Sequence, residues 1–124
     1  MVIFDTSLLV DAARKKKEVR NLIESYSKNE RIATTVINKY ELLRGVPEKE
    51  VGLVSEWLSQ FVIYEFEETA LRETITAYKK LARKGKMVSE LDVLIAGITV
   101  ANDEVLVTRD KDFLNFGDPK IVVL

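Results

Sequence analysis

The sequence contains no cysteine and no histidine. The lack of cysteine excludes disulfide bonds, thiol nucleophiles and zinc–thiolate sites. The lack of histidine removes the commonest general base and the commonest metal ligand. Repeats, linkers and low-complexity tracts are also absent. Any catalysis by this chain must therefore use carboxylates, hydroxyls, lysine, arginine or a bound ion.

No apolar run is long enough to span a membrane and no signal peptide is visible, so we expect a cytoplasmic protein without a membrane partner. The 124 residues, 47% of them hydrophobic, predict one domain over 1–124 with a single core. The net charge of −1 gives no overall attraction to nucleic acid. Basic residues are concentrated in "RKKK" at 14–17 and "KKLARKGK" at 79–86, where they form either solvated helix faces or phosphate contacts.

Hydrophobic patterning predicts strands and helices that alternate along the chain. The strands are expected over residues 2–5, 32–34, 61–66, 105–107 and 121–124. The helices are expected over residues 7–13, 19–26, 35–44, 51–58, 71–82 and 89–101. Strands joined by helices imply a mostly parallel sheet covered on both faces, so the fold class is α/β.

Two of these helices carry apolar stripes. We expect one stripe at Val36, Tyr40 and Leu43, with Glu41 at its border. A second stripe runs along Leu71, Ile75, Tyr78 and Ala82. The helix over 89–101 has few polar residues, so we expect it to be largely buried.

In open parallel sheets, ligands bind beyond the carboxyl ends of the strands. Asp5 in "MVIFDTS" lies at one such end, and Asp110 in "VTRDKDF" lies at another. Either could serve only as a helix cap, although Ser7 could cap the first helix in place of Asp5. Asp112 follows two residues after Asp110, so one of this pair can cap while the other serves a site.

Glu41 and Asp92 lie on predicted helices. Glu41 has a structural alternative as a boundary residue of its helix. Asp92 has one as a partner of the N-cap Ser89 in a capping box. That alternative does not explain why small residues follow Asp92, namely Ala96, Gly97 and Thr99; these would let another backbone or a ligand approach.

Several carboxylates at one edge of a parallel sheet repel each other and raise their own pKa values, which is costly without a cation. Oxygen ligands alone, without histidine or cysteine, suit Mg²⁺ or Mn²⁺. Such ions polarise a phosphate and lower the pKa of a bound water, so no histidine base is needed. This is the chemistry of metal-dependent phosphodiester cleavage.

Four segments in this order, "FDTS", "YELLRG", "LDVLIAG" and "VTRDKDF", resemble the PIN domain family. The resemblance covers the whole chain and is strongest to VapC, the toxin of type II toxin–antitoxin modules. It implies a three-layer α/β/α domain with Mg²⁺- or Mn²⁺-dependent endoribonuclease activity. It also implies a homodimer and a VapB-like antitoxin whose tail enters the active-site groove.

The resemblance matches Asp5, Glu41, Asp92 and Asp110 to the catalytic acids, with Asp5 and Asp92 as the surest metal ligands. Glu41, Asp110 and Asp112 would support them by orienting the attacking water or recruiting a second ion. Small hydroxyl residues would support the site, namely Thr6, Ser7 and Thr108. Basic residues near these motifs would contact RNA phosphates, namely Arg44, Lys84, Lys86, Arg109 and Lys111.

Other functions remain open at this point. A PIN nuclease of RNA processing and a non-catalytic PIN-like binding module both fit the same motifs. A receiver-type domain would show a second acid beside Asp5, where Thr6 stands instead. A dehalogenase-like phosphatase would need an aspartate at position 7, where Ser7 stands.

Overall fold

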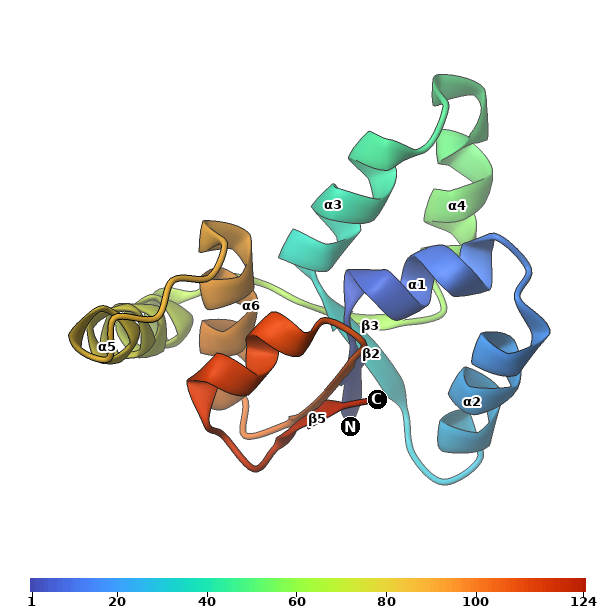
Figure 1. Cartoon of the computed structure of the whole chain (residues 1–124). Helices are drawn as coiled ribbons and strands as arrows, with labels where there is room; N and C mark the ends of the chain where they lie inside the picture. Colours follow the sequence, from blue (N-terminus) through green and yellow to red (C-terminus); the bar gives the residue numbers. More distant parts are fainter.

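Five short strands form one parallel sheet at the centre of the computed structural model, which describes residues 1–124 (Figure 1). Their bounds are β1 Val2–Phe4, β2 Ile32–Thr35, β3 Val62–Tyr64, β4 Val105–Thr108 and β5 Ile121–Val123. The order across the sheet is β3-β2-β1-β4-β5, and every neighbouring pair is parallel. Val2 is in register with Ile32 on one side and Val105 on the other.

Helices cover both faces of the sheet, because successive strand residues point to opposite faces. Val2 and Phe4 pack with helices α1 (Thr6–Ala13), α2 (Lys17–Ser27), α3 (Val36–Gly45) and α4 (Val51–Leu58). Ile3 packs on the other face with α5 (Glu68–Arg83), α6 (Glu90–Ala101) and the short 3₁₀ helix η2 (Lys111–Phe116). A further 3₁₀ turn, η1, spans Glu48–Glu50. The α/β class and the three-layer arrangement are confirmed.

The capping signals in the sequence operate as expected. The Thr35 side chain accepts a hydrogen bond from the Asn38 N–H at 3.1 Å, and the Ser89 side chain accepts one from the Asp92 N–H at 3.2 Å. Gly85, just beyond α5, takes a left-handed φ of 66°, which a side chain would disfavour. No helix is both long and apolar enough to cross a membrane.

Three expectations about local structure are corrected. The strand expected over 61–66 is paired only over Val62–Tyr64, where its neighbour β2 ends at Thr35. On α3, Tyr40 is exposed, and the buried side chains are Asn38 and Leu42. The strand expected over 121–124 ends at Val123, and the helix that Asp110 could cap is the short 3₁₀ helix η2.

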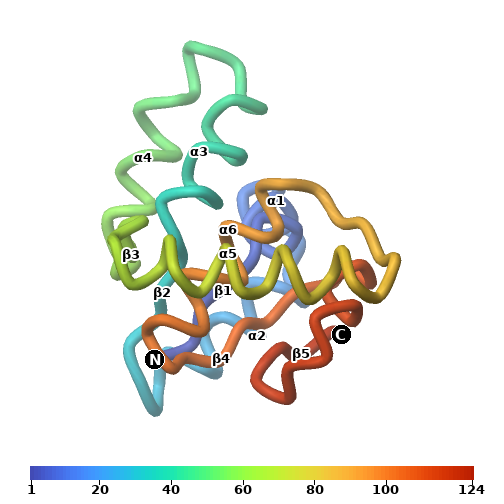
Figure 2. Tube along the Cα trace, turned by 90° about the vertical axis from the view of Figure 1, so that its left-hand side faces the viewer, coloured from blue at the N-terminus to red at the C-terminus, as the bar shows by residue number.

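The apolar stripe of α5 also has a different environment from the one that its period suggests. Leu71, Ile75 and Tyr78 are 39%, 45% and 49% exposed, respectively. Smaller side chains, Ala70 and Thr74, together with Leu81, pack inward instead. Figure 2 shows α5 running across the front of the molecule in that view.

The small residues of α6 are explained by the approach of α5. A Cβ at Gly97 would collide with Thr74 Oγ1 and would lie 2.9 Å from the carbonyl oxygen of Ala70. Both groups belong to α5, so the small face admits a neighbouring helix backbone, as one of the two expectations stated. As expected, α6 is largely buried.

Candidate metal centre

The order of the strands creates one switch point in the sheet. From β1 the chain builds outward through β2 and β3, and then it returns to place β4 on the other side of β1. The loops that follow β1 and β4 therefore diverge at the carboxyl edge, which is where open α/β sheets bind ligands. Asp5 follows β1, and Arg109 and Asp110 follow β4.

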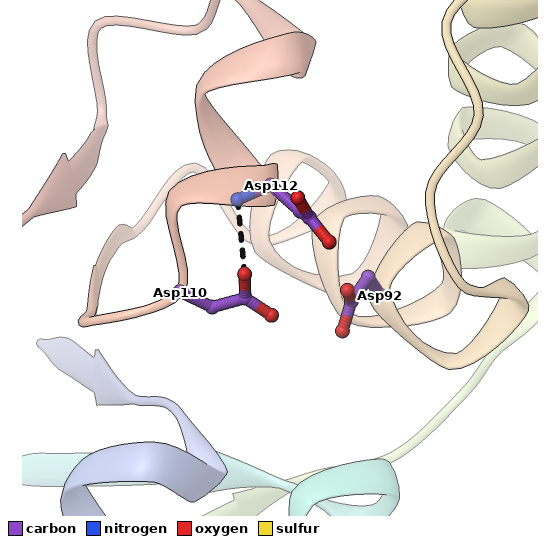
Figure 3. Close-up of side chains that lie close together, drawn as sticks. All are labelled: Asp92, Asp110 and Asp112. Carbon is purple, nitrogen blue, oxygen red and sulfur yellow. Dashed lines mark hydrogen bonds between the residues drawn. The ribbon is translucent and has the colours of Figure 1, made fainter.

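Three carboxylates meet at this edge. Asp92 from the first turn of α6 lies with Asp110 and Asp112, and one oxygen of each lies within 4.8 Å of the others. Figure 3 shows Asp92 facing the two η2 aspartates across a shared space. Asp5 and Glu41 do not belong to this closest group. The assignment of Asp5 and Asp92 as the principal ligands stays a prediction.

Asp110 caps η2 and also lies in the acidic group. Its Oδ1 accepts a hydrogen bond from the Asp112 N–H at 2.9 Å, which caps η2, while the carboxylate also belongs to the acidic group (Figure 3). The Asp110 N–H in turn donates to Thr108 Oγ1 at 3.0 Å. Capping and metal binding are therefore compatible at this residue.

Asp5 is buried, and its side chain makes no capping bond to α1. Its Oδ1 accepts from Asn38 Nδ2 at 2.8 Å, and its Oδ2 accepts from the hydroxyls of Thr108 at 2.6 Å and Ser7 at 3.4 Å. Burial raises the pKa of Asp5, and the negative charge of Asp110 adds to this, although the Thr108 and Asn38 donors oppose the rise. The carboxylate is therefore held in a fixed orientation.

Glu41 lies beside Asp5 and is connected to it through hydroxyl and amide groups. Glu41 Oε1 accepts a hydrogen bond from Thr6 Oγ1 at 2.8 Å. Burial raises the pKa of Glu41 and the charge of Asp5 raises it further, whereas Thr6 and Arg44 lower it. Because the charge of Asp5 raises the pKa of Glu41, the two carboxylates lie close enough to belong to one site.

The pKa of Asp92 is raised to about 7. Burial is the largest cause, followed by the charges of Asp110 and Asp5, and the Ser89 hydrogen bond only partly opposes them. No lysine or arginine lies close enough to Asp92 to form an ion pair. This edge of the sheet thus holds like charges together without a protein cation between them, which favours a bound metal ion.

The five basic residues expected near the site have different environments. Arg109 Nη1 pairs with Asp11 Oδ2 at 2.6 Å, so its guanidinium is already engaged. Arg44 Nη2 lies 4.0 Å from Glu41 Oε2, and its guanidinium stacks over the Tyr40 ring. Lys84 and Lys86, in the loop before α6, and Lys111, at the start of η2, are exposed. Their contact with RNA stays a prediction.

Two polar residues of the site were not identified from the sequence. Asn38 is fully buried and contacts Asp5 and Thr6, and Asp11 holds Arg109. Asn38 precedes Glu41 by three residues, so the helical period places both on one face of α3. That spacing was a usable signal, whereas nothing in the sequence around Asp11 indicates its partner across the fold.

Comparison with known proteins agrees with this fold. The family model described as PIN domain matches residues 2–119. A VapBC2 structure from Rickettsia felis, bound to a promoter DNA fragment, is similar with a TM-score of 0.84, 23% identity and coverage of 100% of this chain and 98% of that chain. DNA-bound VapBC from Salmonella typhimurium is similar with a TM-score of 0.84 and 24% identity, and the match covers 99% of this chain and 96% of that chain. VapBC-5 from Mycobacterium tuberculosis, a member of the VapBC family of toxin–antitoxin systems, has a TM-score of 0.74 and 20% identity. The match covers 98% of this chain and 97% of that chain.

A search of curated proteins found no match. At 20–24% identity the structural neighbours show the fold alone. The family match covers nearly the whole chain, and it agrees with the acidic group at the switch point of the parallel sheet. The chain belongs to the PIN domain family.

Proposed function

We propose that this chain is a metal-dependent endoribonuclease of the VapC type, acting in the cytoplasm as the toxin of a toxin–antitoxin module. The observation that carries the proposal is the meeting of Asp92, Asp110 and Asp112 beside Asp5, with no protein cation among them. The absence of histidine and cysteine means that a metal ion here would be held by oxygen ligands. Membership of the PIN family supports the nuclease assignment.

The donor set fits a hard divalent cation. Carboxylate oxygens within 4.8 Å of one another can share one ion, and Mg²⁺ or Mn²⁺ is held by a few such ligands plus waters. Asp5 and Asp92 would hold it as the principal ligands, with Asp110 and Asp112, whose oxygens lie closest to Asp92, in support. When bound, the ion polarises the phosphodiester and stabilises charge on the phosphate oxygens. Binding also favours the ionised form of Asp92, whose pKa is otherwise about 7.

The remaining residues are assigned to orientation and RNA binding. Glu41, held through Thr6, would orient the attacking water or accept its proton. Lys84, Lys86 and Lys111 are exposed and unpaired, so they are suited to phosphate contacts that add affinity without sequence choice. Arg109 would have to leave Asp11 before it could contact RNA.

We assign a VapB-like antitoxin as the protein partner. The support is the likeness of the fold to proteins solved as VapBC complexes and to a toxin–antitoxin complex from Klebsiella pneumoniae. Co-expression with a neighbouring antitoxin gene, followed by purification through a tag on one chain, tests this assignment. Recovery of both chains in a fixed ratio is expected.

We assign the exposed stripe of α5 as the surface that pairs two copies of the chain. Acidic residues gather at the start of the helix, namely Glu65, Glu67 and Glu68, and basic ones at its end, namely Lys79, Lys80, Arg83, Lys84 and Lys86. In an antiparallel pair of α5 helices each acidic end meets a basic end. The same arrangement places Leu71 opposite Ala82 and Ile75 opposite Tyr78, so a large side chain meets a small one or an aromatic ring.

Sedimentation velocity tests this pairing. Ile75→Glu places a charge in the middle of the stripe and is expected to shift the protein from dimer to monomer. Leu53→Glu is the matched control, because Leu53 on α4 is 72% exposed and lies outside the stripe. A dimer that survives Ile75→Glu, or a wild-type protein that sediments as a monomer, contradicts the assignment.

The nuclease proposal is tested by incubating the purified chain with mixed structured RNAs in Mg²⁺, Mn²⁺ or EDTA. We expect metal-dependent cleavage that Asp92→Asn reduces by about 10²–10³-fold. Glu90→Gln is the control, since Glu90 lies in the same helical turn, is exposed and is not in the acidic group. Equal cleavage by wild type and Asp92→Asn would indicate a contaminating ribonuclease. Metal binding without cleavage would favour a non-catalytic PIN module.

A further inference from the structure

Asn38 is a fully buried amide whose polar atoms all face polar groups. Its Nδ2 donates to Asp5 Oδ1 at 2.8 Å and to Thr6 Oγ1 at 2.9 Å. Its Oδ1 accepts from Thr35 Oγ1 at 2.7 Å. A buried amide with both ends satisfied is held in one orientation, because any rotation would leave a polar atom unpaired.

The neighbouring groups determine which end of the amide faces the acids. Thr35 Oγ1 accepts from the Asn38 main-chain N–H at 3.1 Å, so the hydroxyl proton of Thr35 is free for Asn38 Oδ1. The NH₂ group must then face Asp5, which as a carboxylate can only accept. A flipped amide would set an oxygen against the Asp5 carboxylate and break this contact.

The direction of donation continues beyond the amide. Thr6 Oγ1 accepts from Asn38 Nδ2, and its own proton therefore goes to Glu41 Oε1 at 2.8 Å. Asp5 and Glu41 come from different elements, the end of β1 and the middle of α3. One amide thus sets the position of both acids, Asp5 directly and Glu41 through the Thr6 hydroxyl.

We propose that Asn38 is a positioning residue that holds Asp5 and Glu41 in the orientation needed for divalent cation binding at the carboxyl edge of the sheet. The inference rests on the proposed metal-dependent function, because it assumes that this edge binds a cation. Asn38 is not itself a ligand, since its Oδ1 is occupied by Thr35 and its Nδ2 is a donor. Removing the amide takes away the side-chain donor of Asp5 Oδ1, while Oδ2 keeps the Thr108 and Ser7 hydroxyls.

Asn38→Leu keeps the volume and removes both donors. The probe is Mn²⁺ alone, titrated into the full chain and followed by electron paramagnetic resonance of the free ion. Groups that orient metal ligands typically change affinity by about 10–100-fold, and we expect a loss of this size. Thr6→Val separates the two branches, because it releases Glu41 but leaves the Asn38–Asp5 bond; its affinity should lie between those of wild type and Asn38→Leu.

Thr34→Val is the matched control for buried polar loss. Thr34 is fully buried on β2, and its hydroxyl donates at 2.8 Å to the main-chain carbonyl of Phe4 and to no carboxylate. Its Mn²⁺ affinity should stay within about twofold of wild type. If Asn38→Leu does not fold, Asn38→Ser replaces it, because the shorter hydroxyl also leaves Asp5 without its amide donor.

The outcomes are distinct. Weaker Mn²⁺ binding by a folded Asn38 variant, with Thr34→Val near wild type, supports the positioning role. Wild-type affinity in a folded Asn38 variant, or an equal loss in Thr34→Val, overturns it while leaving the proposed function intact. A wild-type protein that binds no Mn²⁺ overturns the metal-dependent function, and the role of Asn38 with it.

Discussion

Glu104 and Asp92 are both partly withdrawn from water, but they have opposite surroundings. Glu104 lies just before β4. Its carboxylate forms an ion pair with the N-terminal amine of Met1 at 2.9 Å and accepts a hydrogen bond from the Tyr64 hydroxyl at 2.8 Å. Asp92, at the other end of the sheet, faces Asp110, Asp112 and the charge of Asp5. Glu104 raises the pKa of the amine, and together with burial it raises the pKa of Tyr64 to about 12.

The difference separates charge that serves stability from charge that serves binding. A carboxylate next to an amine and a phenol stabilises the fold without a ligand. Carboxylates gathered without a counter-charge destabilise the fold at neutral pH, so a sequence selected only for stability would not hold them. The carboxyl edge is therefore where a bound cation stabilises the fold most. Glu104, with the Met1 amine and Tyr64, is the internal control for the tests of that edge.

The largest expected effect on stability comes from metal addition. Mn²⁺ at about 100 times its dissociation constant should stabilise the protein by about 2.7 kcal/mol at pH 8. At pH 5.5 the effect should be smaller, because Asp92, with its pKa at about 7, then holds a proton that competes with the ion. Thermal unfolding followed by circular dichroism measures both. A Tm unchanged by Mn²⁺ at pH 8 would argue against a cation site.

A smaller effect is expected from Asp92→Asn in the metal-free protein. The folded state keeps the Asp92 proton up to about pH 7, whereas the unfolded chain loses it near the ordinary value of 3.8. The unfolded state therefore binds fewer protons between these values, and stability falls as pH rises through 7. The variant should remove this fall and be more stable at pH 8 by about 1 kcal/mol, after discounting for partial exposure of the carboxyl.

Urea unfolding at pH 5 and pH 8, with EDTA present, gives the free energy of unfolding at each pH. The difference between the two values measures the pH dependence of wild type and of Asp92→Asn. Glu104→Gln belongs in the same series, because it should leave the pH dependence between 5 and 7 as in wild type. Near pH 8 it adds a change of its own, since it removes the carboxylate that raises the pKa of the Met1 amine. A parallel decline in Asp92→Asn and wild type would assign the pH dependence to another group.

The smallest effect is expected from Glu104→Gln itself. It keeps the shape of the side chain but weakens its contacts with the amine and with Tyr64, so stability should fall by about 0.5–1 kcal/mol. Mn²⁺ affinity and RNA cleavage should not change, since Glu104 lies away from the acidic group. A change in Mn²⁺ affinity would show that the two ends of the sheet are coupled.

Much of the fold follows from local pattern. The short apolar run "VIF" and the capping residues Thr35 and Ser89 suffice to place β1, α3 and α6. The shared edge of Asp5 and Asp110 follows from the rule that parallel strands end on one side. The α5 stripe was misplaced because a helical period shows which side chains share a face, but not which face meets the core.

The sequence by itself determined the α/β class, the order of the acids and the exclusion of histidine and cysteine chemistry, because these depend on residue type and spacing. Only the tertiary structure decided that Gly97 admits α5, that Arg109 is paired with Asp11, and that Asn38 joins Asp5 to Glu41. Each of these contacts joins elements that are distant in the chain. They depend on distances of a few ångströms between packed elements, and such distances are not encoded in any local period.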